Sequence, residues 1–171
     1  MADKYLKHNE GNIEEQEAST TSTGVTDAGK IPALDSTGRL DTSMMPVGVG
    51  ADAKNITASE NLAAGDFVNI YNNSGVSVRK ADASDAVKTA DGFVLSNVTS
   101  GNQVLVYFEG VNNQLSGLTI GENYYLSHST PGSIVTAVGL TSTTGHIIQR
   151  LGRAVDTTEI AFEHTNPIKL A

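Results

Sequence analysis

Aromatic side chains are distributed unevenly along this chain, and their distribution limits where a hydrophobic core can form. Residues 1–50 contain one aromatic residue, Tyr5, and residues 51–171 contain all the others: Phe67, Tyr71, Phe93, Tyr107, Phe108, Tyr124, Tyr125 and Phe162. A chain of 171 residues is long enough for one domain and an appendage. The sequence therefore predicts an extended N-terminal arm over residues 1–50 and one folded domain over residues 51–171.

The arm carries spaced apolar side chains although it has no core of its own. Two prolines and two glycines between residues 29 and 46 argue against a long helix there. Apolar side chains on such a segment indicate that another chain covers them. The predicted partner-binding residues are Ile31, Pro32, Leu34, Leu40, Met44 and Met45.

The other parts of the arm are polar. Residues 13–17 are expected to form a short helix, although isolated helices of this length barely hold in water. Residues 18–29 have the composition of a linker, and residues 47–52 that of a flexible junction.

The domain shows short runs of β-forming residues at roughly ten-residue spacing, separated by turn residues. These runs are residues 66–71, 76–80, 92–96, 103–109, 123–127, 133–137, 147–155 and 158–163. Residues 72–75 are predicted to form a hairpin turn, and residues 164–171 an extended tail in which Pro167 prevents ladder pairing. The predicted fold is mainly β, a small antiparallel β-barrel or sandwich with little helix.

Charge and composition exclude several classes of function. The formal net charge is −8 and the sequence pI is about 4.8, with no basic cluster, so nucleic-acid binding is not expected. No apolar run approaches the roughly 18 residues of a membrane span, and the first ten residues lack an apolar signal core. The absence of cysteine excludes disulfides and thiolate zinc sites.

The residues that could carry chemistry do not form a recognisable catalytic pattern. His8, His128, His146 and His164 lack metal-ligand spacing, and residues 82–85 are interpreted as a polar loop because the EF-hand pattern is absent. In residues 158–163, strand alternation predicts Ile160 and Phe162 in the core and both glutamates, Glu159 and Glu163, in solvent. We expect no enzyme, no metal and no cofactor.

Three tyrosines are the only candidates for stacking on sugars: Tyr107, Tyr124 and Tyr125. Because neighbouring residues of a strand face opposite sides, one member of the pair Tyr124 and Tyr125 is expected in the core. The other is expected at a subunit contact, so both are candidates for that contact.

Two stretches resemble structural proteins of tailed bacteriophages. The first is Gly29-Lys-Ile-Pro-Ala-Leu-Asp-Ser-Thr-Gly-Arg-Leu-Asp-Thr-Ser-Met-Met-Pro46. The second is Leu118-Thr-Ile-Gly-Glu-Asn-Tyr-Tyr-Leu-Ser-His-Ser-Thr-Pro-Gly-Ser-Ile-Val135 with Ile148-Gln-Arg-Leu-Gly-Arg-Ala-Val155, which is similar to the β-module of head-decoration (cement) proteins and of head or tail fibres.

The resemblance implies a virion structural protein, displayed on the outer surface of the phage head and made in the bacterial cytoplasm. It implies a homotrimer whose N-terminal arm binds the major capsid protein or a neighbouring subunit. From charge and composition, neither nucleic acid nor a membrane is expected as a partner.

Three other interpretations remain open. The chain could be a phage fibre or receptor-binding protein whose β-domain recognises a host glycan. It could be a small hydrolase or lyase with Glu109 or Glu122 as the acid, although no base, nucleophile or metal set accompanies them. It could also be a β-domain with a disordered tail and no fixed partner, which would leave the apolar residues of the arm unexplained.

Overall fold

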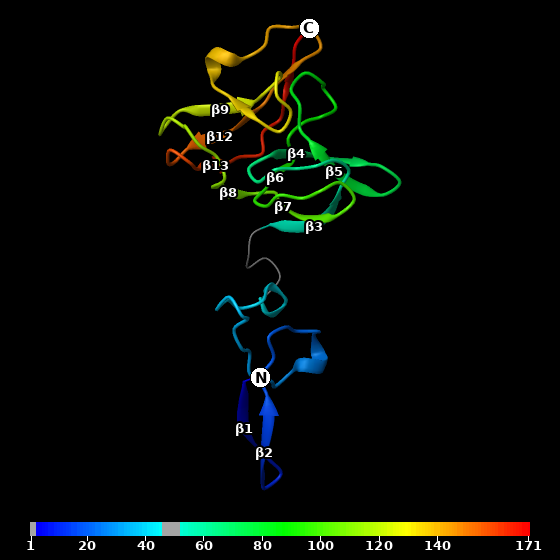
Figure 1. Ribbon diagram of the computed structural model, residues 1–171, viewed down its shortest axis with the longest axis vertical. Helices are drawn as coiled ribbons and strands as arrows, with labels where there is room; N and C mark the ends of the chain where they lie inside the picture. Colours follow the sequence, from blue (N-terminus) through cyan, green and yellow to red (C-terminus); the bar gives the residue numbers. More distant parts are fainter. Residues whose placement is uncertain (1–2, 46–51) are drawn as a thin grey trace. The chain divides into compact units, whose positions relative to one another are not determined.

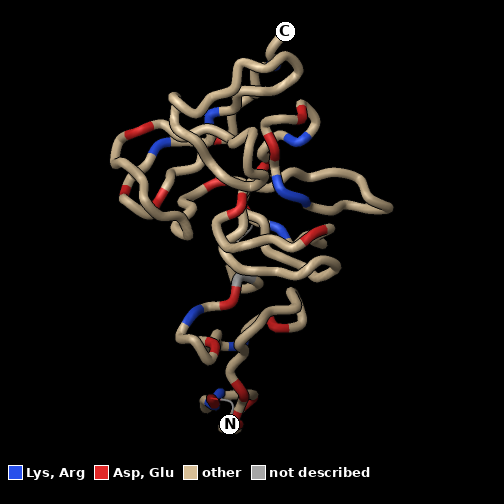
Figure 2. The backbone as a smooth tube through the Cα atoms, turned by 45° about the horizontal axis from the view of Figure 1, so that its top comes forward, with Lys and Arg blue, Asp and Glu red and all other residues tan. Residues whose placement is uncertain are grey.

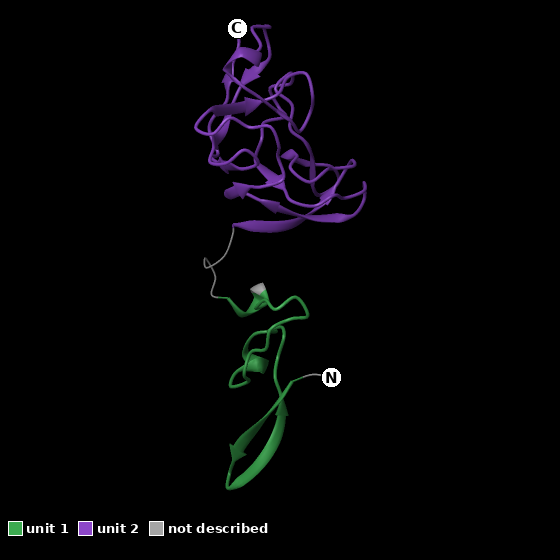
Figure 3. Cartoon of the chain, turned by 60° about the vertical axis from the view of Figure 1, so that its left-hand side comes forward, with its two compact units in different colours: residues 1–50 green, residues 51–171 purple. Residues whose placement is uncertain are grey.

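The computed structural model describes residues 3–45 and 52–171. The chain divides into two compact units, Met1–Gly50 and Ala51–Ala171 (Figure 3). Pro46 and residues 47–51 of the predicted junction lie outside the described residues.

The first unit begins with a β-hairpin where the sequence predicted a helix. Strand β1 (Lys4–Asn9) pairs antiparallel with β2 (Asn12–Glu17), from Lys4 opposite Glu17 to Asn9 opposite Asn12 (Figure 1). Glu10 and Gly11 connect them with φ angles of 46° and 93°, which is the geometry of a two-residue hairpin turn. The prediction of a helix over residues 13–17 was wrong, because the ladder gives those residues more hydrogen bonds than so short a helix can provide.

The second unit contains a closed five-stranded barrel. Its strands are β3 (Ala53–Ala58), β4 (Phe67–Asn72), β5 (Val76–Lys80), β6 (Gly92–Val94) and β7 (Gln103–Tyr107), in the order β3-β5-β4-β6-β7. This confirms the mainly β prediction. One pair differs from the expected antiparallel arrangement, because β3 and β5 are parallel where Thr57 lies opposite Ser77. The interior is filled by aliphatic side chains: Ile56, Ala58, Leu62, Val68, Val78, Val94, Val104 and Val106.

A second sheet packs against the barrel (Figure 1). Its strands are β8 (Gly110–Asn112), β9 (Asn123–Leu126), β10 (Ile134–Val135), β12 (Arg150–Ala154) and β13 (Ile160–Phe162), in the order β10-β9-β12-β13-β8. Between the two sheets, the rings of Phe67, Phe93 and Phe162 have centroids 5.6–6.2 Å apart. Ile160 and Phe162 are buried while Glu163 is exposed and Glu159 only partly buried, which confirms the predicted alternation of β13.

The C-terminal tail pairs with the domain more than predicted. Strand β14 (Ile168–Lys169) pairs antiparallel with β11 (Ile147–Ile148), so the ladder resumes immediately after Pro167. The helical content is limited to three short 3₁₀ turns in the described residues: η1 (Val25–Asp27), η2 (Thr42–Met44) and η3 (Ala137–Gly139). None of the helices in the described ranges is long and apolar enough to cross a membrane.

Two residues fix close approaches between segments of the domain. The buried amide of Gln149 accepts a hydrogen bond from the Ala90 N–H (2.7 Å) and donates to the Ala90 and Thr165 carbonyls (2.9 and 3.1 Å). Gly152, with φ of 148°, lies so close to β13 that a Cβ atom would stand 2.0 Å from the Ala161 carbonyl oxygen. Only glycine fits at this point.

Candidate functional site

Among residues 3–41 and 43–45, the arm contains no buried side chain. Of the predicted partner-binding residues, Ile31 is 51%, Leu34 59%, and Leu40 and Met45 each 39% exposed. Pro32 is also exposed, and Met44 is half-buried. The arm therefore presents large apolar side chains to solvent without a core beneath them, which is the condition that the sequence predicted.

The segment around Ile31 is joined to the hairpin by hydrogen bonds. Ser19, just after β2, forms a parallel bridge with Pro32: its N–H donates to the Ile31 carbonyl (3.0 Å) and its carbonyl accepts from the Ala33 N–H (2.8 Å). The Ile31 N–H donates to the Tyr5 hydroxyl oxygen (3.3 Å). Because Tyr5 belongs to β1, these bonds set the position of Ile31 relative to the hairpin.

Leu34 and Leu40 flank one tight turn. The Asp35 N–H donates to the Arg39 carbonyl (2.8 Å), and Gly38 adopts a φ of 76° that suits glycine. The Asp35 carboxylate accepts from the Thr37 N–H (2.8 Å), the Thr37 hydroxyl (2.7 Å) and the Arg39 N–H (3.0 Å). The two leucines therefore stand at the two ends of a turn that the Asp35 carboxylate closes.

Two further aspartates close neighbouring turns in the same way. The Asp27 carboxylate accepts from the Thr23 N–H and hydroxyl (both 2.7 Å) and pairs with Lys30 (2.8 Å). The Asp41 carboxylate accepts from the Ser43 N–H (2.9 Å) at the start of η2. These bonds favour the charged carboxylate, so the pKa values of Asp27, Asp35 and Asp41 are lowered, chiefly by the side-chain hydrogen bonds from Lys30, Thr37 and Ser43 respectively.

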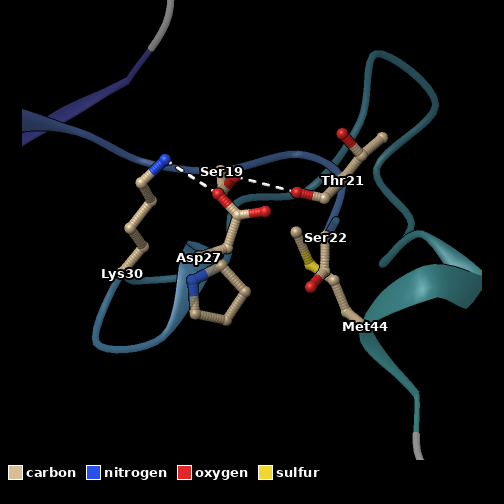
Figure 4. A pocket seen from close by; sticks show the side chains of 7 residues that line it. Ser19, Thr21, Ser22, Asp27, Lys30 and Met44 are labelled. Carbon is tan, nitrogen blue, oxygen red and sulfur yellow. Dashed lines mark hydrogen bonds and ion pairs between the residues drawn. The ribbon is translucent and has the colours of Figure 1, made fainter. Parts of the chain in front are cut away.

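A small hollow of about 180 Å³ lies among these turns (Figure 4). Ser19, Thr21, Ser22, Asp27, Lys30, Pro32 and Met44 line it. Figure 4 shows the Asp27–Lys30 ion pair among the residues that line the hollow. The Ser19 hydroxyl, also in the lining, donates a hydrogen bond to the Thr21 carbonyl. Its polar groups are thus engaged in holding the turns, and Met44 supplies an apolar side to it.

Acidic residues outnumber basic residues in both units. Residues 1–50 contain eight carboxylates and four lysines and arginines, and residues 51–171 contain eleven and seven. Figure 2 shows the two signs interspersed along the backbone. A partner of the arm is therefore favoured when its surface combines apolar and basic groups.

The two candidate tyrosines differ in position. Tyr124 is only 5% exposed, packs with Leu118, Ala154 and Ile160, and accepts a hydrogen bond from the Thr119 N–H (2.9 Å) on its hydroxyl. Tyr124 is therefore the core member of the pair, as strand alternation predicted, and it has little surface left for a subunit contact. Tyr125 is half-buried and stays a candidate. The Tyr107 ring is stacked on Phe93, with centroids 5.5 Å apart.

The histidine and glutamate side chains that could take part in catalysis or metal binding remain dispersed, with one exception. Glu109 and Glu122 are exposed, and Glu163 pairs with Arg150. His128 and His146 lie together although they are 18 positions apart in the sequence: their ring centroids are 5.9 Å apart, and His146 Nδ1 is hydrogen-bonded to the Thr141 hydroxyl (2.9 Å). In the part of the chain that the structure describes, no group of three His, Asp or Glu side chains could hold a metal ion.

Comparison with known proteins gives no family for this chain. No protein-family model matches it, and no curated protein is significantly similar to it.

The turn-closing aspartates were missing from the predicted site. A detectable signal was present, since Asp35 and Asp41 each follow a leucine and each precede a hydroxyl residue two positions later, Thr37 and Ser43. Aspartate side chains commonly accept hydrogen bonds from the backbone two residues ahead. That pattern predicts an ordered turn next to each leucine.

Proposed function

We propose that this chain is a virion structural protein of a tailed bacteriophage, namely a capsid decoration protein that binds the outside of the head through its N-terminal arm and stabilises the shell. The supporting observation is that the arm exposes Ile31, Leu34, Leu40 and Met45 on hydrogen-bonded turns without a core of its own. The resemblance of residues 29–46 to segments of phage structural proteins supplies the identity of the partner, the major capsid protein.

The energetics of the arm are consistent with binding. Covering a large apolar side chain stabilises by about 1.5–3 kcal/mol, whereas ordering one residue of backbone costs about 1–2 kcal/mol. Hydrogen bonds already hold residues 35–39 and the bridge between Ser19 and Pro32 before any partner is present. Part of the ordering cost is therefore met in the unbound arm, and more of the apolar contact energy is available for affinity.

In this proposal the β-domain is what the arm attaches to the shell. As a homotrimer, with Tyr125 at the subunit contact, the protein would present three arms to adjacent capsid sites. Linking several binding segments raises the overall affinity without any new contact. The proposed role is passive, so no catalytic group is assigned.

Deletion of residues 1–46 tests the proposal. The domain has its own two-sheet core, so the truncated protein is expected to stay folded and to lose binding to expanded empty heads of the phage that encodes it. Sedimentation with the heads measures binding, and the heat resistance of the coated heads measures stabilisation. Coating by the truncated protein at full occupancy would contradict the arm's role.

The location of the bound protein separates decoration from the fibre alternative. Electron microscopy of the particles is expected to show copies distributed over the whole shell. Copies confined to a vertex or to the tail would favour a fibre or receptor-binding protein.

A further inference from the structure

We infer that the domain has a second binding site, a hollow for a neutral saccharide at one end of the barrel. The hollow measures about 450 Å³ and is lined by Asn61, Asn97, Val98, Thr99 and Asn102. It lies outside the arm, and neither the proposed capsid contact nor the proposed subunit contact uses it.

The hollow is formed by two loops that hydrogen bonds hold together. One loop joins β3 to β4 and the other joins β6 to β7. Leu62 and Val98 exchange two backbone hydrogen bonds of 2.9 Å, and the Ser100 hydroxyl donates to the Ser59 carbonyl (2.9 Å). The Gly101 N–H donates to the Ala58 carbonyl (2.7 Å). The loops are therefore ordered before any ligand binds, which reduces the entropic cost of binding.

Each asparagine is held at one end of its side-chain amide. Asn61 Oδ1 accepts from the Ser100 N–H and Asn97 Oδ1 from the Ala64 N–H, both at 2.9 Å. A backbone N–H can only donate, so oxygen must face it in both cases and the NH₂ groups are the other ends. Asn102 has the reverse orientation, because its Nδ2 donates to the Thr99 carbonyl (3.4 Å), which can only accept, and to the Thr99 hydroxyl (2.7 Å).

The other ends of these amides match the chemistry of a saccharide. Within the described ranges, no hydrogen bond is recorded for the NH₂ groups of Asn61 and Asn97 or for Asn102 Oδ1. Two donors and one acceptor therefore remain around the hollow, and sugar hydroxyls can both accept and donate. Val98 adds an apolar surface for the C–H face of a sugar ring.

The lining also determines the charge of the ligand. No lysine, arginine or carboxylate lines the hollow, and residues 92–108 contain no charged residue. An anionic or cationic ligand would have no ionic partner there. A neutral mono- or disaccharide is the ligand class that uses all the lining groups, with a dissociation constant of about a millimolar for so small a ligand.

The test is NMR titration of the full-length, isotope-labelled protein with glucose, galactose, mannose and N-acetylglucosamine, with glycerol and inorganic phosphate as comparison ligands. We expect at least one sugar to shift the side-chain NH₂ signals of Asn61 and Asn97, and neither comparison ligand to do so. If no sugar shifts these signals, if the shifts lie elsewhere on the domain, or if phosphate binds equally well, the inference is wrong.

Variants make the test specific. Asn97→Leu keeps the approximate side-chain size and removes the NH₂ group, and it is expected to weaken sugar binding about tenfold or more. Asn72→Leu is the matched control, because Asn72, at the end of β4, also accepts a backbone N–H on its Oδ1, that of Gly75 (3.1 Å). Thr99→Val, close in shape, is expected to weaken binding a few-fold. An equal effect of Asn72→Leu, or sugar binding left intact by both Asn97→Leu and Thr99→Val, would overturn the inference.

Discussion

Replacing Leu34 and Leu40 with serine is expected to weaken capsid binding without changing the stability of the domain. Leu34 is 59% and Leu40 39% exposed in the unbound protein, so these fractions of their surface are available to a partner. Full burial of a leucine is worth about 1.5–3 kcal/mol, so covering the exposed fractions gives about 0.9–1.8 kcal/mol for Leu34 and about 0.6–1.2 kcal/mol for Leu40.

Together these figures predict a loss of roughly ten- to a hundredfold in affinity for each arm, since 1.4 kcal/mol corresponds to a factor of about ten. The assay is a binding isotherm of the double variant on expanded empty heads, with thermal unfolding of the free protein measured in parallel. The matched control is Val25→Ser, an exposed apolar residue of the same arm that is not among the predicted contacts. The control is expected to bind like the unsubstituted protein.

Two results would refute this reasoning. If the double variant bound the heads with unchanged affinity, the two leucines would not lie at the contact. If the melting temperature of the free domain fell by several degrees, the leucines would pack on their own chain instead of a partner. An equal loss from Val25→Ser would show that any apolar residue of the arm contributes, without a specific site.

Three further predictions concern the domain and the turns of the arm. Gly152→Ala should destabilise the domain by several kcal/mol in chemical denaturation, because its Cβ would stand 2.0 Å from the Ala161 oxygen; an unchanged midpoint would contradict this packing. The lowered pKa values of Asp35 and Asp41 mean that their turns are fully stabilised above the ordinary value of 3.8 and lose this contribution as the pH falls through the lowered values. Amide NMR signals of Thr37 and Ser43 should therefore stay constant from pH 7 to about pH 4 and change below it; a change near pH 6 would exclude these carboxylates as the cause. Tyr125→Ala should reduce the trimer fraction in analytical ultracentrifugation, whereas an intact trimer would remove Tyr125 from the contact.

The strands that the sequence predicted are those with clear alternation of apolar and polar residues. In residues 159–163, Ile160 and Phe162 alternate with Glu159, Ala161 and Glu163, and burial of one face follows directly from that pattern. Strand β3 was missed, although it closes the barrel, because its buried residues Ile56 and Ala58 are few and lie among polar neighbours. Its role depends on pairing with β5 and β7, which are distant in sequence and leave no local signal.

The hairpin of the arm was missed for a different reason. Residues 13–17 are rich in glutamate, which favours a helix, whereas the turn at Glu10 and Gly11 favours pairing of the flanking strands. When β1 pairs with β2, the ladder provides hydrogen-bond partners for the backbone groups of both strands. This gain in hydrogen bonding outweighs the helical preference of a five-residue segment.

For the candidate sites, the sequence indicated which residue types are present better than which of them lie close together in the fold. The spacing of apolar residues between Ile31 and Met45 was sufficient to predict that large apolar side chains of the arm are exposed, whereas their contact with a partner stays a prediction. The convergence of Asn61 with Asn97 could not be predicted, because the bridge between Leu62 and Val98 that joins their loops is formed only in the folded barrel.

The way in which the arm is held suggests how it would respond to a partner. Its order depends on exposed hydrogen bonds, each worth about 0.5–1.5 kcal/mol net, and on a two-stranded hairpin, which alone is of marginal stability in water. Leu34 and Leu40 stand at the base of the Asp35–Arg39 turn, so a surface that covers both lies against this base and shields its hydrogen bonds from water, among them that from the Arg39 N–H to the Asp35 carboxylate. Hydrogen bonds strengthen when the local dielectric falls. Apolar contact and turn stability should therefore reinforce each other, so that Asp35→Ala weakens capsid binding although its carboxylate makes no bond to the partner.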